Sequence, residues 1–454
     1  MKILLTVPIS CYRDSHPDIP DLGLGYLAAS LRHCGHVPLL IDWGRKDSEK
    51  SFSAFISDHA PQAVGIKTFT KNFRAIRKTI RLVRKFSQDI PIILGGPHAT
   101  AENPAKLLRD FPDVPYVIRG EAEEVLPRLL HALEQGDTSP DFPGLLTVSA
   151  GQNGFESGPV LLEEGAPDQP AWDLLDPSSY APVTVGKKIA GLNISPIVAT
   201  RGCPCHCTFC STPLVSGKKI RYRSLEALLA EMRFLAEKHA VNQFVFVDMN
   251  FTHSREWLLN FCAAVQRIGE KVYWNGITSP GFYRYADASL LKRMKNAGCR
   301  TLVMGVETAS PPVRERVKKQ PGLEKITALS RWAEEAGIER RGYFMYGFPE
   351  ETPDEMEATY QYAFSGLFDL LSFDLCFPLP GTEMLRQYLE KNQLAELQWD
   401  TFSPANPPAP ISRASSRELA SILRKSRLRA MVREKGILRT SVAVLKKIPV
   451  IVHG

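Results

Sequence analysis

Four cysteines and one histidine fall between Cys203 and Cys210, in the stretch ATRGCPCHCTFCS. Three of them, Cys203, Cys207 and Cys210, are spaced C-x3-C-x2-C and follow a predicted β-strand. Three thiolates on one short loop can each bind one iron of a four-iron cluster, which leaves the fourth iron open to a small molecule. The spacing therefore predicts an iron–sulfur site, with Cys205 outside the ligand set.

A structural zinc site is the alternative, because thiolates also bind zinc. Such a site normally takes a second pair of ligands from elsewhere in the chain. No second C-x2-C and no H-x3-5-H spacing occurs in this sequence. The missing pair favours the iron–sulfur cluster.

The composition is that of a water-soluble globular protein of 454 residues, with 44% hydrophobic and 23% charged residues. No apolar run approaches the roughly 18 residues that a membrane-spanning helix needs, and the N-terminus lacks the features of a signal peptide. We therefore expect a cytoplasmic protein whose cysteines are thiols or metal ligands and not disulfides.

The net charge of +7 is concentrated near the C-terminus. Residues 413–447 carry eleven Lys or Arg and two Glu, so this segment is +9 and the rest of the chain is −2. The slightly negative charge of the rest of the chain does not indicate that the protein binds nucleic acid. The segment predicts an amphipathic helix that starts after Ser415 and Ser416 and ends at Gly436. We expect it to cap the preceding domain, with peripheral membrane contact through anionic lipid as the alternative.

Short β-branched runs alternate with helical patterns over residues 1–137. Five strands separated by helices predict an α/β, doubly wound, flavodoxin-like parallel sheet, which binds ligands at the carboxyl ends of its strands. Residues 138–190 hold seven prolines and predict a linker with a hairpin at Asn153 and Gly154. Residues 191–395 predict six further strand–helix units, which fit a partial (β/α)6 barrel. Residues 396–454 form the basic, helical C-terminal segment.

The cysteine motif and four later stretches resemble the signature of radical S-adenosylmethionine (SAM) enzymes. The stretches are RGCPCHCTFC, FVDMNF, MGVETAS, YFMYGFPEET and FPLPGTEM, and the match covers residues 195 to about 390. The resemblance implies that Cys203, Cys207 and Cys210 hold a [4Fe–4S] cluster whose open iron binds SAM. One electron then cleaves SAM and releases a 5′-deoxyadenosyl radical.

The same resemblance implies further SAM contacts. Phe209 would pack near the adenine, while Asp248 and Glu307 would face the SAM amino group and ribose. Met249 departs from the commonest form of the second-strand motif. For Asp248 a structural role at the end of its strand is therefore the alternative.

The first 137 residues resemble the cobalamin-binding domain that precedes many radical SAM domains. The resemblance is carried by PDLGLGYLAASLRHCGHVPLLID, GIKTFTKN, LGGPHAT and VIRGEAEEVLP. It places the cofactor against the strand-end loops, at Thr68, Gly95, Gly96, His98, Gly120 and Glu121. The string Gly23, Gly25, Ala28 also matches a dinucleotide fingerprint. Those glycines do not directly follow the first strand, however, and close helix–sheet packing explains them.

The sequence lacks the motif that usually supplies a ligand to the lower face of cobalamin. Methionine-synthase-type proteins carry D-x-H-x-x-G, but here Asp14 and His16 are followed by Ile19 in place of glycine. We therefore expect no protein imidazole on cobalt. The lower face would be covered by residues 67–73, with Lys67 or Phe69 as candidates.

Together the two resemblances imply a cobalamin-dependent radical SAM methyltransferase that acts on an unactivated carbon or phosphorus centre. Its substrate would be a small or lipid-like molecule, and a flavodoxin or ferredoxin would supply electrons. We expect the substrate between the carboxyl end of the sheet and the barrel mouth, with Tyr346 as a catalytic candidate. The pocket candidates, each of which could equally be a core residue, are Asn250, Trp274, Tyr343 and Tyr346.

Two other functions stay open. The same cofactors could catalyse a cyclisation, a ring rearrangement or an oxidation without methyl transfer. A zinc-binding or dinucleotide-binding protein is the more remote alternative.

Overall fold

The computed structural model describes residues 1–9, 20–42, 49–147, 158–163, 169–180, 193–268, 272–401 and 411–435. The chain divides into two compact units. Unit 1 is Met1–Thr184, Ile189–Cys205 and Ser211–Asn250, and unit 2 is Val185–Lys188, His206–Cys210 and Phe251–Gly454. No helix in the described ranges is both long and apolar enough to cross a membrane.

Unit 1 is built on a six-stranded sheet with the strand order β2-β1-β3-β4-β5-β6. The first five strands are parallel. They are β1 (Lys2–Thr6), β2 (Val37–Ile41), β3 (Ala63–Lys67), β4 (Ile92–Gly95) and β5 (Tyr116–Ile118). Aliphatic residues of β1, β3 and β4 are buried, as expected for strands covered on both faces. The predicted flavodoxin-like sheet is confirmed.

The sixth strand, β6 (Leu145–Thr147), pairs antiparallel with β5 at the edge of this sheet. It comes from the segment that we expected to be a linker. Leu145 and Leu146 are buried, so the burial of their side chains draws this part of the segment into the first sheet. The expected hairpin at Asn153 and Gly154 lies outside the described residues.

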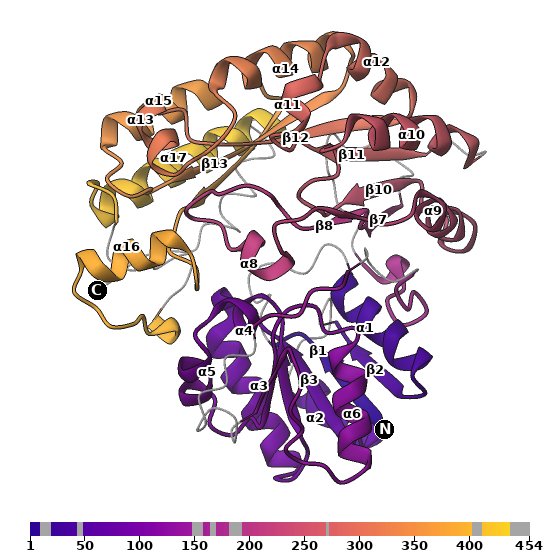
Figure 1. The fold of residues 1–454 in the computed structure, drawn as a ribbon. Helices are drawn as coiled ribbons and strands as arrows, with labels where there is room; N and C mark the ends of the chain where they lie inside the picture. Colours follow the sequence, from indigo (N-terminus) through magenta and orange to yellow (C-terminus); the bar gives the residue numbers. More distant parts are fainter. Residues whose placement is uncertain are drawn as a thin grey trace. The chain divides into compact units, whose positions relative to one another are not determined.

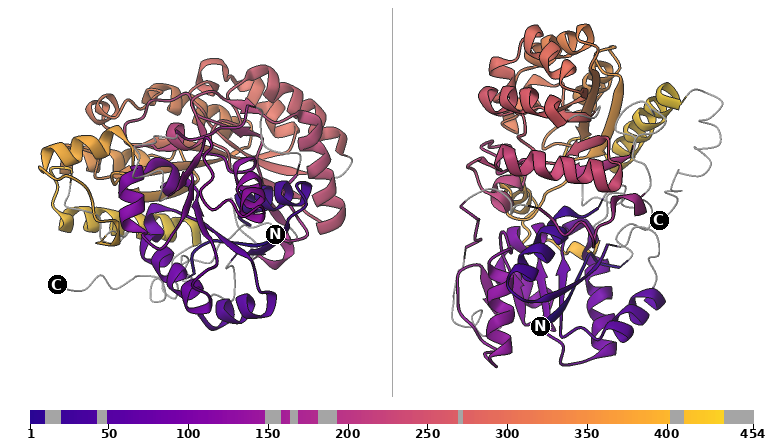
Figure 2. Two further views of the ribbon diagram at one scale, coloured as in Figure 1. Left: turned by 60° about the horizontal axis from the view of Figure 1, so that its bottom comes forward. Right: turned by 90° about the vertical axis from the view of Figure 1, so that its right-hand side faces the viewer.

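Helices cover both faces of the sheet (Figures 1 and 2). One pair packs together on one face, α1 (Leu22–His33) with α6 (Val125–Glu134), and a second pair packs together, α2 (Glu49–His59) with α3 (Phe73–Phe86). A 3-10 turn η1 (Thr70–Asn72) precedes α3, and the short helices α4 (Pro97–Ala101) and α5 (Pro104–Asp110) follow β4. The helices expected between the strands of residues 1–137 are therefore present.

The rest of unit 1 holds the first part of the predicted partial barrel. β7 (Ile194–Ile197) pairs in parallel with β10 (Gln243–Phe246), and α9 (Leu225–His239) lies between them in sequence. A short antiparallel pair, β8 (Thr200–Arg201) and β9 (Arg221–Tyr222), flanks the cysteine stretch and α8 (Thr212–Ser216). These two strands hold the ends of the cysteine stretch together.

Unit 2 contributes four parallel strands in the order β14-β13-β12-β11. They are β11 (Tyr273–Ile277), β12 (Cys299–Glu307), β13 (Glu339–Tyr346) and β14 (Leu370–Leu375). The helices of this unit are α10 (Arg255–Val265), α11 (Phe282–Tyr285), α12 (Ala288–Asn296), α13 (Pro311–Arg316), α14 (Leu323–Glu335), α15 (Pro353–Ala363) and α16 (Glu383–Lys391). In Figure 1, α12, α14 and α15 lie along one side of β12 and β13. Six parallel strands alternating with helices are the predicted (β/α)6 array.

The basic helix α17 (Ser416–Lys435) packs against β14 and α15 of unit 2. Leu419 and Ser426 are buried in this contact. Three of the basic side chains of α17 contact unit 2 residues, in the pairs Arg427–Asp374, Lys425–Glu357 and Arg429–Tyr360. The geometry of α17 is that of the expected structural cap, and it gives no support to membrane contact. Residues 436–454 lie outside the described residues.

Candidate cofactor sites

A cavity of about 410 Å³ lies at the carboxyl ends of β3, β4 and β5 in unit 1. The strand ends contribute Lys67, Gly95, Gly96 and Gly120 to its lining. The stretch that leads into the cysteine motif lines the same cavity, through Val198, Thr200, Arg201 and Gly202. The cavity therefore lies where a doubly wound sheet binds its ligand and directly before Cys203 in the chain.

Gly95 and Gly96 keep one wall of the cavity free of side chains. A Cβ atom at Gly95 would meet nothing closer than the Ile118 carbonyl, at 3.8 Å. Gly96 has a φ of +93°, which favours glycine. About half of the remaining lining is aliphatic and five of its residues are charged, so the cavity suits a broad ligand with an apolar ring and polar edges, such as a corrin.

Thr68 and His98, two predicted cofactor contacts, are not in the described lining of the cavity. The Thr68 hydroxyl donates to the Gly95 carbonyl at 2.7 Å and accepts from the Ala99 N–H at 3.1 Å. His98 is buried, and its Nδ1 lies 3.0 Å from the Thr70 hydroxyl. Burial lowers the pKa of His98 to about 3, so the ring is neutral. Both residues hold the loop after β4 in place, and their contact with a cofactor stays a prediction.

Lys67 lines the cavity, as expected of a candidate for the lower face of cobalamin. Its ammonium group is 2.7 Å from each carboxylate oxygen of Asp21 and 5.3 Å from the centre of the Phe69 ring. His16 lies outside the described residues. The occupant of the lower face therefore stays a prediction.

Ion pairs with little exposure support the strand before the cysteine motif. Arg201 pairs with Glu123 at 2.6 Å and with Glu121 at 3.5 Å, and Arg221 donates two hydrogen bonds to Glu121 at 2.6 and 2.7 Å. Burial would lower the pKa of Arg201, but Glu123 and Glu121 raise it. Glu121 lines the cavity and is also bound to two arginines. Sequence reasoning missed both arginines, although Arg201 stands two residues before Cys203.

The backbone around Cys203 is tightly packed. Gly202 has a φ of +94°, and a Cβ atom there would lie 2.1 Å from the Lys219 carbonyl oxygen. The Cys203 N–H donates to the Gly217 carbonyl at 2.9 Å, and the Asn250 amide donates to the Gly202 carbonyl at 2.9 Å. Asn250, expected in the substrate pocket, thus supports the cysteine loop.

Cys207 and Cys210 lie in the part of the cysteine loop that belongs to unit 2, His206–Cys210. The Cys210 N–H donates to the Cys207 carbonyl at 3.1 Å. Thr208, between them, donates its N–H to the Val317 carbonyl at 3.1 Å and accepts from the Met384 N–H at 3.0 Å. Backbone bonds from two sides therefore set the course of this segment.

Among the described residues, no three Cys, His, Asp or Glu side chains are placed to share one metal ion. A four-iron cluster requires a different arrangement, because each of its thiolates binds its own iron. The thiolates proposed as cluster ligands, those of Cys203, Cys207 and Cys210, therefore need not meet at one ion.

Glu307 ends β12 with a φ of +67°, a strained conformation that is common at functional sites. Its carboxylate pairs with Lys319 at 3.1 Å. Burial works against the charge of Lys319, but Glu307 and Cys207 outweigh it and raise the lysine pKa. Sequence reasoning missed Lys319, which brings a positive charge near one predicted cluster ligand and one predicted SAM contact.

Asp248 lines the cavity and is bound at both carboxylate oxygens. Oδ1 accepts from the Ala199 N–H at 3.2 Å, and Oδ2 accepts from the Thr200 hydroxyl at 2.5 Å. Burial raises the pKa of Asp248 to about 6. The structural role at a strand end is therefore present, and contact with SAM stays a prediction.

Two aromatic pocket candidates differ in their surroundings. Trp274 is fully buried among Phe251 and Phe261, and its ring nitrogen donates to the Ala297 carbonyl at 2.7 Å. Tyr343 is 39% exposed. Trp274 is thus a core residue, and Tyr343 is accessible to a ligand.

Tyr346 is fully buried, stacks on Phe373, and has its hydroxyl 2.8 Å from the Ser426 hydroxyl. This placement gives no support to a catalytic role. Tyr346→Phe is therefore expected to retain SAM cleavage and to lower the free energy of unfolding by about 1 kcal/mol, because Ser426 loses its partner. Release of 5′-deoxyadenosine and denaturant unfolding measure the two effects. Loss of SAM cleavage with unchanged stability would restore the catalytic assignment.

Two family models match separate parts of the chain. The model of the radical SAM superfamily matches residues 197–363, and the model of the B12 binding domain matches residues 13–130. The chain is 26% identical over 446 residues to an uncharacterised methyltransferase of Pyrococcus horikoshii, covering 97% of this chain and 94% of that protein. It is 25% identical over 392 residues to an anaerobic magnesium-protoporphyrin IX monomethyl ester cyclase of Rubrivivax gelatinosus, covering 84% and 69%.

A solved structure shows the same fold. The radical SAM methyltransferase TsrM of Kitasatospora setae, with cobalamin and a [4Fe–4S] cluster bound, aligns with a TM-score of 0.66 at 21% identity, covering 86% of this chain and 75% of that one. The radical SAM domain implies a [4Fe–4S] cluster and SAM as cofactors, and the B12-binding domain implies cobalamin. Three cysteines on one loop are a suitable donor set for the cluster, and the cavity beside Gly95 leaves room for a flat ligand. The chain thus joins a B12-binding domain to a radical SAM domain and belongs to the cobalamin-binding members of the radical SAM superfamily.

Proposed function

We propose that this protein is a methyltransferase that acts on an unactivated carbon or phosphorus centre of a small or lipid-like molecule. The cavity of unit 1 carries the proposal. Its lining joins the strand loops of the B12-binding domain to Gly202, the residue before the first cysteine of the motif. A ligand that fills the cavity thus contacts the motifs of both families.

The three cofactors, when bound, supply a substrate radical and a transferable methyl group. The residues of the chain bind and orient these groups. Gly95 and Gly96 admit a flat ligand to the backbone, while the aliphatic lining excludes water. Arg201, held by Glu121 and Glu123, orients the strand that leads to Cys203.

We assign the remaining roles as the sequence predicts. Cys203, Cys207 and Cys210 hold the cluster; Phe209, Asp248 and Glu307 contact SAM. Cobalamin lies against the loops of Thr68, Gly95, Gly96, His98, Gly120 and Glu121. A flavodoxin or ferredoxin supplies the electron. Lys319 joins the SAM contacts, because its charge lies beside Glu307.

The similarity to the magnesium-protoporphyrin cyclase favours one second candidate, a cyclisation that uses the same cofactors without methyl transfer. The two functions differ in the fate of the SAM methyl group. In a methyltransferase of this kind cobalamin would serve as the carrier of this group, whereas a cyclase would not need such a carrier.

Methyl-deuterated SAM distinguishes the two functions without knowledge of the substrate. The anaerobically reconstituted protein, given this SAM, cobalamin and a reductant, is expected to form trideuteromethyl-cobalamin and S-adenosylhomocysteine. Mass spectrometry detects both products. If 5′-deoxyadenosine accumulates while the cobalamin stays unlabelled, methyl transfer is the wrong reaction and the cyclase-type function is favoured.

A further inference from the structure

Glu351 is a fully buried acidic residue in the loop that follows β13. Its Oε2 accepts hydrogen bonds from the N–H groups of Gly347 at 2.7 Å and Phe348 at 3.0 Å. The Glu351 N–H donates in turn to the Phe348 carbonyl at 3.0 Å. Because two successive N–H groups converge on one side-chain oxygen, the carboxyl group fixes the course of the turn.

The turn determines where Phe348 lies. The Phe348 side chain is fully buried and packs edge-on against Phe209, with ring centroids 5.4 Å apart and planes at 65°. Phe209 directly precedes Cys210, whose N–H is bonded to the Cys207 carbonyl. A continuous series of contacts therefore runs from Glu351 through two phenylalanine rings to two proposed cluster ligands.

The second carboxyl oxygen, Oε1, is buried and has no hydrogen-bond partner among the described residues. A buried polar atom without a partner lowers stability. Burial also raises the pKa of Glu351 to about 7, although the Phe348 and Gly347 N–H groups act against this. Such buried acids concentrate at functional sites, where placement matters more than stability.

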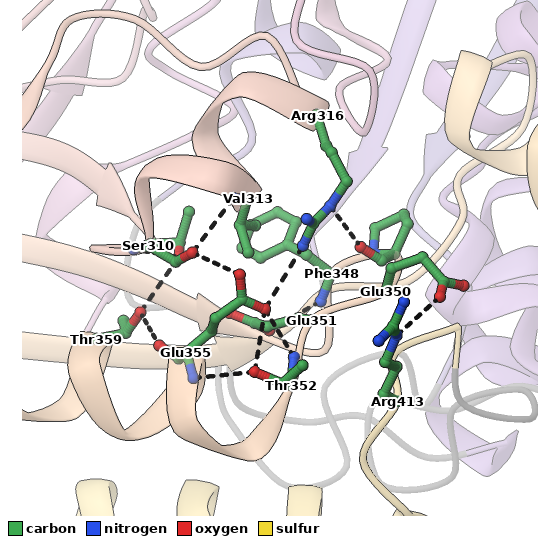
Figure 3. Close-up of polar contacts among 12 residues, drawn as sticks. Ser310, Val313, Arg316, Phe348, Glu350, Glu351, Thr352, Glu355, Thr359 and Arg413 are labelled. Atoms are coloured by element: carbon green, nitrogen blue, oxygen red, sulfur yellow. Dashed lines mark hydrogen bonds and ion pairs between the residues drawn. The ribbon is translucent and has the colours of Figure 1, made fainter.

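The neighbouring acids have other partners (Figure 3). Glu350 is partly exposed and pairs with Lys391 and with Arg413, the latter at 3.1 Å. Glu355 completes a capping box with Thr352 at the start of α15 and accepts from the Ser310 hydroxyl at 2.9 Å. In this part of the chain, Glu351 is the acid that binds the turn before Pro349.

We propose that Glu351 is a positioning residue of the SAM site, which holds Phe348 against Phe209 and so fixes the side of the site that receives the adenine. This inference rests on the proposed assignment of the cluster ligands and of Phe209. Glu351 acts through the two rings, and its carboxyl group takes no part in the reaction.

Four variants of the cluster-loaded protein test the inference. Glu351→Ala leaves two buried N–H groups without an acceptor and is expected to weaken SAM binding about tenfold or more. Phe348→Ala is expected to do the same. Glu351→Gln keeps an oxygen for both N–H groups and is expected to bind SAM within about twofold of the wild type. Glu350→Gln, the matched control, removes only partly exposed ion pairs and is expected to bind SAM normally.

SAM binding is measured from the change that SAM causes in the electron paramagnetic resonance spectrum of the reduced cluster. Iron content and thermal unfolding are recorded for each variant. Wild-type affinity in Glu351→Ala would overturn the inference, and so would equal losses in Glu351→Ala and Glu351→Gln. If Glu351→Ala does not fold, Phe348→Leu takes its place, and unchanged affinity in that variant would reject the contact series.

These measurements involve neither cobalamin nor methyl transfer. They can therefore fail while the proposed methyltransferase function holds, and the converse is also true. A wild-type protein that reconstitutes no cluster, or whose cluster does not respond to SAM, would count against the assignment of the cysteine motif.

Discussion

Replacing Cys203, Cys207 or Cys210 by alanine is expected to reduce the release of 5′-deoxyadenosine to background. In the proposed cluster each thiolate would bind a different iron, so a cluster on two thiolates could not keep its open iron in place for SAM. The loop should keep its course in these variants, because it is held by backbone bonds from the Cys203 N–H and the Thr208 N–H. The loss of activity would then reflect the missing thiolate. Anaerobic reconstitution, iron and sulfide analysis, and quantification of 5′-deoxyadenosine check the result.

Cys205→Ala is the matched control, since it lies in the same loop but outside the C-x3-C-x2-C spacing. It is expected to keep its cluster and most of its SAM cleavage. If Cys205→Ala lost the cluster while Cys207→Ala kept it, the ligand assignment would be wrong.

Gly95→Phe is expected to abolish cobalamin binding and leave the cluster intact. The backbone of Gly95 needs no positive φ, and the space above it is open, so a phenyl group would project into the cavity without straining the strand. The Kd for cobalamin should rise well over tenfold, because a steric cost of ~1.4 kcal/mol already raises it tenfold, so little cobalamin should stay bound. Absorption spectra of the corrinoid after gel filtration measure the occupancy.

Gly95→Ala is the size control. Its Cβ would lie 3.8 Å from the Ile118 carbonyl, an ordinary contact, so cobalamin binding should stay near the wild-type level. Iron content and SAM cleavage should be normal in both variants. Full cobalamin occupancy in Gly95→Phe would show that the cofactor binds elsewhere than in this cavity.

Local features of the sequence were enough to predict the positions of most helices and strands and to identify the cysteine motif. The helices at 225–238, 287–296 and 323–336 are expected from hydrophobic periodicity, and they occur as α9, α12 and α14 with nearly the same bounds. Periodicity over one helix or strand depends only on nearby residues, which is why it can be read directly. The C-x3-C-x2-C spacing is local in the same sense.

The face that a strand residue presents could be predicted only in part. Tyr343 and Tyr346 stand three positions apart on β13, so alternation assigns them to opposite faces. Which face the helices cover depends on how the strand packs. The structure buries Tyr346 beside Phe373 and Ser426 and leaves Tyr343 partly exposed.

The ion-pair partners of charged side chains could not be predicted from the sequence. Arg221 binds Glu121, which is 100 positions earlier in the chain, and Lys319 binds Glu307 across the end of β12. Such pairs form only where the ends of distant elements meet, and nothing in the spacing of the residues encodes that meeting. The pairing of β6 with β5 was not predicted for the same reason, since it depends on burial against the first sheet.

By itself, the sequence determined the spacing of the three cysteines, the two arrays of strands and helices, and the glycines at the end of β4, because spacing and side-chain size are properties of short stretches. Only the tertiary structure decided that Val198, Thr200, Arg201 and Gly202 line the same cavity as Gly95 and Gly96. It also decided that the Glu351 carboxylate accepts a hydrogen bond from the Phe348 N–H and that the Tyr346 hydroxyl lies 2.8 Å from the Ser426 hydroxyl. These contacts join residues that are far apart in the chain or on opposite sides of a turn, so they exist only once the strands have packed.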